Sequence, residues 1–242
     1  MGDQIGLTEA KAELLKKRLA KAKEKHTRAS SSEMSGRSSG SLQPLTDGAP
    51  KYLSYAQRRL WFLEQFDENS ASYNMYMVRK IQGRLERESF QKALKAVVDR
   101  HEALHCVYEV EGEEPVMKRR PELEVELREE DLSGFSGFSG IPGFSGIGSK
   151  QEEELKRRVK EEIGRPFKLE RELPLRVRLY KLGEEEQALL VVIHHIACDA
   201  YSSNLFLNEL AACYEKAKSG SDETPEPLPA QYADYAAWQR EE

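Results

Sequence analysis

The sequence predicts an α/β fold, a two-layer mixed sandwich preceded by a linker helix. Three observations lead to this prediction. From Lys51 onward, stretches with helical spacing of apolar residues alternate with stretches that have the spacing of strands. Residues 188–193 form a continuous apolar run rich in β-branched side chains, which is typical of a central strand covered on both faces. The first fifty residues, by contrast, carry too few apolar residues to form a core of their own.

The amino-terminal region divides into a helix and a linker. Residues 1–27 place leucines at helical spacing among many Lys, Glu and Ala residues, with Thr8 as an N-cap, which predicts an exposed amphipathic linker or docking helix. Residues 28–50 are rich in Ser and Gly and predict a flexible linker.

The next elements follow from the spacing of their apolar residues. Residues 52–66 predict a helix, with Ser54 as the N-cap and Trp61 packed inward; its spaced apolar residues are Ala56, Leu60 and Leu63. A strand is then predicted from Met75, Met77 and Ile81, and a helix from Phe90, Leu94, Val97 and Val98. Residues 104–110 and 115–119 flank a Gly-containing turn and predict a hairpin.

The second half repeats this alternation. A strand is expected at Leu123, Val125 and Leu127, a helix at Leu155, Val159 and Ile163, and a strand at Leu175, Val177 and Leu179. After the apolar run, Phe206, Leu210, Cys213 and Tyr214 predict a helix with Ser202 or Ser203 as its N-cap. Residues 133–146 repeat Ser-Gly-Phe and predict a mobile surface loop inserted into this plan.

The candidate site lies where the apolar run ends on His194 and His195, with Asp199 four residues after the second histidine. A turn between a buried strand and a helix is where α/β folds place reacting groups. Three other interpretations are open. The histidines can be hydrogen-bonded core residues with Asp199 capping the helix; the residues can be metal ligands; or Cys198 can be a nucleophile with His195 as base. A shared metal ion is disfavoured because successive strand side chains point to opposite faces.

Four motifs extend the argument to the whole chain after residue 50. They occur in the order Leu53-Ser54-Tyr55-Ala56-Gln57-Arg58-Arg59-Leu60-Trp61-Phe62-Leu63, Arg100-His101-Glu102-Ala103-Leu104, His194-His195-Ile196-Ala197-Cys198-Asp199 and Tyr232-Ala233-Asp234-Tyr235-Ala236-Ala237-Trp238. Together they resemble the first four signature motifs of the condensation domains of nonribosomal peptide synthetases. The resemblance implies one lobe of the chloramphenicol acetyltransferase-like fold, with residues 51–220 as an amino-terminal lobe and residues 221–242 as a crossover segment toward a second lobe.

The resemblance also implies the chemistry. A condensation domain joins an acyl or peptidyl thioester to an amine, each carried on the phosphopantetheine arm of a carrier protein, and forms an amide bond, as in antibiotic and other secondary-metabolite biosynthesis. His195 matches the histidine expected to be catalytic, either as a base or through its ring N–H. His194 is expected to orient and pack, and Asp199 to hold the turn as an anion. No cofactor or metal bound by the chain is implied.

The implied partners are donor and acceptor carrier proteins and other synthetase modules or a second lobe. His194 argues against the heterocyclising branch of the family, which has Asp there. Two rival functions are a non-catalytic module that binds carrier proteins and a degenerate remnant.

Two residues depart from the family pattern. Ala200 replaces the Gly expected after the motif aspartate, and His105 replaces the Arg expected after the second motif. The first raises the question of whether a Cβ obstructs a close backbone approach. The second removes the guanidinium that is expected to pair with the aspartate. We expect Asp199 to turn back toward the lobe, near His105 or Arg100.

Composition excludes several other classes. A net charge of −5 argues against nucleic acid as a partner, and no apolar stretch approaches the roughly 18 residues of a membrane span. The three cysteines show no CxxC spacing and are expected to be reduced thiols. We therefore expect a cytoplasmic protein.

Overall fold

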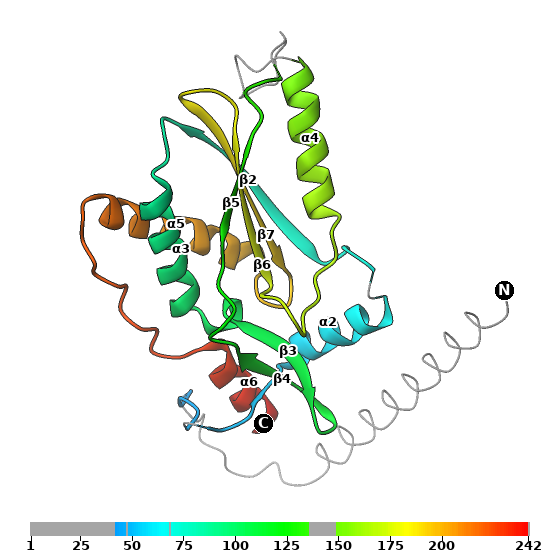
Figure 1. The fold of residues 1–242 in the computed structure, drawn as a ribbon. Helices are drawn as coiled ribbons and strands as arrows, with labels where there is room; N and C mark the ends of the chain where they lie inside the picture. The colour runs from blue at the N-terminus through cyan, green and yellow to red at the C-terminus, as the bar shows by residue number, and fades with distance from the viewer. Residues whose placement is uncertain (1–41, 47, 68, 136–148, 242) are drawn as a thin grey trace, which may run out of the picture. The chain divides into compact units, whose positions relative to one another are not determined.

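A computed structural model describes residues 42–46, 48–67, 69–135 and 149–241 (Figure 1). The helix expected within residues 1–27, most of the expected linker and most of the Ser-Gly-Phe repeat lie outside the described residues. The elements are β1 (Lys51–Tyr52), α2 (Tyr55–Phe66), β2 (Asn74–Gln82), α3 (Arg87–Arg100), the 3₁₀ helix η1 (Glu102–Leu104), β3 (Cys106–Glu111), β4 (Glu114–Arg119), β5 (Leu127–Asp131), α4 (Ser149–Ile163), β6 (Leu175–Lys181), β7 (Glu186–His194), α5 (Ala200–Lys218) and α6 (Tyr232–Glu241).

Two sheets organise these elements. The larger has the strand order β2-β7-β6-β5, with β5 and β6 parallel and the other pairs antiparallel. The smaller has the order β1-β4-β3, and its β3–β4 hairpin turns at Gly112, whose φ of 65° favours glycine. The predicted α/β class is therefore confirmed, and so is the prediction that the apolar run is a central strand that ends at His194.

The larger sheet is covered on both faces. Leu189, Val191 and Ile193 of β7 pack toward α3 and α5, while Leu190 and Val192 pack in a second cluster on the other face. That second cluster contains Trp61 of α2, Tyr108 of β3 and Leu155 of α4. Burying each such side chain stabilises the fold by roughly 1.5–3 kcal/mol. The strand that ends at His194 is therefore packed on both faces. Helices α3 and α5 lie on one side of the sheet and α4 on the other (Figure 1).

The first motif forms α2, with an unexpected buried face. Ser54 caps the helix and Gln57 completes a capping box, as the sequence predicts for the cap. The buried residues, however, are Gln57, Trp61 and Glu64, whereas Ala56 and Leu63 are exposed. Two polar side chains therefore face the interior of the lobe beside the tryptophan.

One predicted strand begins later in the chain than expected. Residues 123–126 form no strand, and β5 begins only at Leu127. The side chain of Gln91 on α3 donates to the Val125 carbonyl at 2.6 Å and accepts from the Leu127 N–H at 2.9 Å. These are the backbone groups that a neighbouring strand would otherwise bond, so the side chain replaces the ladder here.

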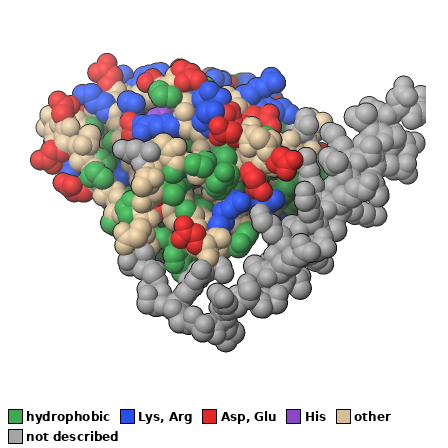
Figure 2. Space-filling view, turned by 90° about the horizontal axis from the view of Figure 1, so that it is seen from below, with side chains coloured by type: hydrophobic (Ala, Val, Ile, Leu, Met, Phe, Trp, Pro, Cys, Tyr) green, Lys and Arg blue, Asp and Glu red, His purple; other side chains and the backbone are tan. Residues whose placement is uncertain are grey.

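The carboxyl-terminal segment packs on the rest of the described fold. Helix α6 contacts β1 and η1, and Asp234 of the fourth motif accepts hydrogen bonds from the N–H groups of Leu45 at 2.8 Å and Gln231 at 2.6 Å. Acidic, basic and apolar side chains are interspersed on the face seen in Figure 2. In the part of the chain that the structure describes, no helix is long and apolar enough to cross a bilayer.

Candidate active site at the end of β7

The turn after β7 is fixed by backbone hydrogen bonds on both sides. The N–H of His194 donates to the Pro174 carbonyl at 2.9 Å, and the N–H of His195 donates to the Tyr73 carbonyl at 2.8 Å. The chain then reverses, with the Ala197 N–H donating to the His194 carbonyl at 3.0 Å. The two histidines consequently have fixed backbones, and their side chains differ completely in surroundings.

His194 is a core residue. Its side chain is only 1% exposed and meets the ring of Phe167 edge-on, with ring centroids 5.9 Å apart. Nδ1 accepts the Ile196 N–H at 3.1 Å, so Nδ1 is unprotonated and the ring proton is on Nε2. Nε2 lies 3.3 Å from Oε2 of Glu64 on α2 and donates to it. His194 is therefore neutral, with a defined tautomer.

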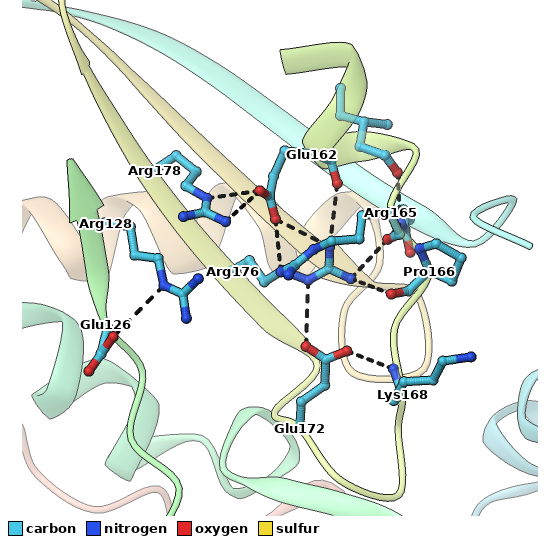
Figure 3. A network of polar contacts seen from close by, with 11 residues as sticks. Glu126, Arg128, Glu162, Arg165, Pro166, Lys168, Glu172, Arg176 and Arg178 are labelled. Carbon is cyan, nitrogen blue, oxygen red and sulfur yellow. Dashed lines mark hydrogen bonds and ion pairs between the residues drawn. The ribbon is translucent and has the colours of Figure 1, made fainter. Parts of the chain in front are cut away.

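An arginine network lies next to Phe167, the ring that His194 meets edge-on, and Figure 3 shows the polar contacts of Arg176 in this network. The guanidinium of Arg176 lies 3.6 Å from the ring centroid of Phe167 and donates to the carbonyls of Arg165 and Pro166 at 2.9 and 3.0 Å. Its Nη1 also bonds Glu162 at 3.2 Å. Burial and then the charge of Arg165 lower the pKa of Arg176, and Glu172 and Glu162 offset part of this effect. Phe167 therefore contacts both the Arg176 guanidinium and the His194 ring, which links the arginine network to the end of β7.

His195 is exposed, with one ring nitrogen occupied. Nδ1 lies 2.7 Å from the Cys198 carbonyl. A carbonyl oxygen only accepts, so Nδ1 carries the proton and the neutral ring leaves a lone pair on Nε2. Among the described residues, no group forms a hydrogen bond with Nε2. His195 therefore presents a proton acceptor to solvent on a turn that fixes its orientation.

Asp199 is the N-cap of α5. Its carboxylate accepts from the N–H of Ser202 at 2.7 Å and from the Ser202 hydroxyl at 2.6 Å. The Ser202 hydroxyl and then its N–H lower the pKa of Asp199. The prediction of Ser202 or Ser203 as the cap is wrong, because Asp199 is the residue that is still extended where the helical backbone begins. Ala200 is the first helical residue and is exposed, in a backbone conformation that does not require glycine.

The expected partners of Asp199 bind other residues, so the predicted pairing is wrong. Arg100 forms an ion pair with Glu209 and donates to the Glu226 carbonyl at 2.8 Å. His105 is buried with Nδ1 2.8 Å from Asp99, at ion-pair distance but without hydrogen-bond geometry. The local N-cap satisfies Asp199 within four residues, which leaves it no need of a distant cation.

The geometry also bears on two other interpretations of the motif, a Cys198 nucleophile and a set of metal ligands. Burial raises the pKa of Cys198, which keeps its thiol protonated, and Sγ lies 3.4 Å from the Ser203 hydroxyl. A Cys198 nucleophile is thus disfavoured. In the described part of the chain, no group of three His, Cys, Asp or Glu residues is arranged to hold a metal ion.

Two residues that the sequence does not predict also support the turn. Gln57 donates through Nε2 to the Ile196 carbonyl at 3.1 Å, and Glu64 contacts His194. Both lie on the helical face of Trp61, four residues before it and three after. Trp61 is predicted to face inward, so residues four before it and three after it are expected on the same buried face. This spacing is the sequence signal that could identify Gln57 and Glu64.

Comparisons with known proteins agree with this arrangement. A family model for the condensation domain matches residues 50–242. One of the linear gramicidin synthase proteins of Brevibacillus parabrevis is 34% identical over 209 residues, which are 86% of this chain and 3% of that protein. The isonitrile lipopeptide synthase of Mycobacterium tuberculosis is 35% identical over 190 residues, which are 78% of this chain and 7% of that protein.

Solved structures share the fold. The X-domain in a complex with OxyB from teicoplanin biosynthesis has a TM-score of 0.70 and 25% identity, covering 86% of this chain and 41% of that one. The first condensation domain of the calcium-dependent antibiotic synthetase has a TM-score of 0.68 and 24% identity, covering 80% and 44%. The fold is thus that of condensation domains, the chloramphenicol acetyltransferase-like fold, and the chain spans less than half of either solved chain.

Proposed function

The chain belongs to the condensation-domain family, and on that premise we propose that it is the amino-terminal lobe of a domain that forms amide bonds. The substrates are a donor acyl or peptidyl thioester and an acceptor amine, each on the phosphopantetheine arm of a carrier protein. The observation that carries the proposal is the exposed His195, whose Nδ1–H is bonded to the Cys198 carbonyl while Nε2 is left as an acceptor.

This geometry supports a base role for His195. As the acceptor nitrogen attacks the thioester carbonyl, the new C–N bond forms and Nε2 takes the proton released from nitrogen. Collapse of the tetrahedral intermediate breaks the C–S bond, and the proton returns from Nε2 to the departing sulfur. The alternative role, orientation of the amine by a ring N–H, is less well supported because the ring N–H already bonds Cys198.

The supporting residues then act through the turn. His194 holds the backbone of the turn, because its Nδ1 accepts the Ile196 N–H. Asp199 caps α5, which directly follows the turn. Ala200 occupies a helical, exposed position, so its methyl group is compatible with this turn. Arg100 and His105 belong to the scaffold of the lobe, since their partners lie outside the turn.

We propose that activity requires a second lobe. The solved relatives are more than twice as long as the part that this chain covers, and a single exposed turn offers one wall of a substrate channel. Two carrier arms cannot be held at attack distance by one wall. We also propose that the protein acts in the cytoplasm, where synthetase modules and carrier proteins are available as partners.

The test is amide formation between two loaded carrier proteins, followed by mass spectrometry of the carrier-bound product. We expect no appreciable product from the 242-residue chain alone and product from this lobe joined to a second lobe. In the two-lobe protein, His195→Ala should lower the rate about 10²- to 10⁴-fold. The control is His101→Ala, which removes a histidine that bonds Glu209 rather than the turn. Product formation by the isolated chain that survives His195→Ala would refute the proposal.

A second candidate function is a non-catalytic interaction module. One observation favours it: a solved relative with this fold is an X-domain in a complex with OxyB. Two results together would identify a binding module. The affinity for carrier proteins would be unchanged by His195→Ala, and the two-lobe protein would form no amide product.

A further inference from the structure

We infer that Glu64 is a positioning residue that fixes the tautomer of His194 and, through it, orients the turn that carries His195. Glu64 lies on α2, 130 residues before His194 in sequence. The catalytic consequence of this role rests on the proposed function, whereas its structural content can be tested without activity.

Glu64 is placed unusually for an acidic residue. It is only 4% exposed, and its Oε2 faces Nε2 of His194 at 3.3 Å. Its other oxygen, Oε1, is buried and has no hydrogen-bond partner among the described residues. Burying a carboxyl group with one of its oxygens unsatisfied costs free energy, so an apolar residue at this position would stabilise a purely structural helix better. The placement is explained if the carboxyl group is needed by its neighbour.

What Glu64 supplies is an acceptor for the Nε2–H of His194. The neutral ring has one proton. Nδ1 cannot carry it, because Nδ1 already accepts the hydrogen bond donated by the Ile196 N–H. The proton must therefore stay on Nε2, buried, and no other acceptor for it is present in the described part of the chain. Glu64 thus favours the tautomer in which Nδ1 is free to accept from the turn. Without Glu64, a proton on Nε2 has no partner, and a shift of that proton to Nδ1 would break the bond to Ile196.

The consequence reaches His195 through Ile196. The N–H of Ile196 is held by His194, and its carbonyl is held by Gln57 at 3.1 Å. The contact with the carbonyl comes directly from Gln57 on α2. The contact with the N–H depends on α2 because that helix supplies Glu64, the acceptor for His194. His195 precedes the anchored Ile196, and its ring bonds the carbonyl of Cys198 two residues further on. A loosened Ile196 therefore lets the ring of His195 leave the orientation in which Nε2 faces solvent.

The test is imidazole ¹⁵N NMR of the 242-residue chain, compared among wild type, Glu64→Gln and Glu64→Leu. In wild type, His194 should show one protonated and one unprotonated nitrogen, with the proton on Nε2. Glu64→Gln should keep this pattern, because the amide oxygen still accepts. Glu64→Leu should mix or reverse it, while backbone amide spectra report a retained fold. Gln65→Leu is the matched control, since Gln65 bonds Glu170 and leaves His194 unchanged.

Two results would overturn the inference: a wild-type His194 protonated on Nδ1, or an unchanged tautomer in a folded Glu64→Leu chain. If Glu64→Leu does not fold, the wild-type and Glu64→Gln spectra decide by themselves. In the two-lobe protein, Glu64→Leu should lower kcat at least about tenfold with little change in KM for the carriers, and Glu64→Gln should recover most of it. Confirmed tautomers with no amide formation by wild type would instead refute the proposed function alone.

Discussion

Two regions of the molecule contain a histidine beside an acidic residue, and they differ in how completely the side chains are paired. The turn at the end of β7 leaves Nε2 of the exposed His195 without a partner among the described residues. The second region, the Glu209 junction, consists of Arg100, His101, Glu209 and Gln231. There, Nε2 of His101 lies 2.6 Å from Glu209, Arg100 forms an ion pair with the same carboxylate, and Gln231 donates to the Arg100 carbonyl at 3.0 Å.

The difference shows why residue types alone do not identify a site. Both regions contain residues of signature motifs. In the Glu209 junction, Arg100 and His101 bind Glu209, and Arg100 also bonds the Glu226 carbonyl, so the junction connects α3 to α5 and to the segment before α6. The turn keeps its buried histidine paired and exposes the other. The second and fourth motifs of this chain therefore hold the fold together, whereas the third leaves the His195 ring exposed.

The largest expected effect separates the two adjacent histidines. His194→Ala should reduce the free energy of unfolding of the 242-residue chain by about 2–4 kcal/mol, because it removes a buried ring and leaves Ile196 and Glu64 without their partner. His195→Ala should cost about 1 kcal/mol or less, since the ring is exposed. Urea unfolding of the two variants measures this contrast. Equal losses would remove the distinction between a supporting and a presented histidine.

The next test addresses the Glu209 junction. Glu209→Gln should lower the free energy of unfolding by about 1–2 kcal/mol at pH 7, because hydrogen bonds to charged groups are lost. Burial would raise the pKa of Glu209, but the hydrogen bonds of His101 and Arg100 hold it below its ordinary value. A lowered carboxyl pKa stabilises the fold above its unfolded value of about 4.3, and this contribution disappears as the pH falls through the folded value. The gap between wild type and variant should therefore close in acid; a gap that widens would contradict the pairing.

The cap of α5 gives a smaller effect. Asp199→Ala should destabilise the chain by about 1 kcal/mol, and Asp199→Asn by clearly less, because Asn also caps helices. The lowered pKa of Asp199, caused first by the Ser202 hydroxyl, predicts that the difference between wild type and Asp199→Asn shrinks as the pH falls below about 3.9. Thermal unfolding at pH 7 and pH 3 checks both statements. A cost for Asp199→Asn as large as that for Ala would point to a distant cation after all.

The smallest effect is expected at Ala200. Ala200→Gly should cost up to about 1 kcal/mol through the lower helix propensity of glycine, and should leave the rate of amide formation in the two-lobe protein within about twofold. Unfolding and product assays of this variant measure it. A large gain in rate would show that the methyl group obstructs a substrate, and would make the departure from the family pattern functional.

The sequence by itself determined the order of the elements and the place of the candidate site. Apolar alternation around β7 and helical spacing after it are local properties, so they located His194 and His195 at the end of a buried strand. The N-cap at Ser54 and the β3–β4 hairpin follow from turn and capping chemistry within a few residues, and these too were predictable.

Only the tertiary structure decided which groups meet. The contacts of Glu64 with His194 and of Gln57 with Ile196 join residues 130 and 139 positions apart, and no local pattern encodes such pairings. A predicted strand begins late because the amide of Gln91, on another element, bonds the backbone of residues 125 and 127. Asp199 does not pair with the expected cation because its carboxylate already accepts from Ser202. This cap lies within four residues and needs no long-range contact. Local chemistry fixes what each segment can form, and packing selects the long-range partners.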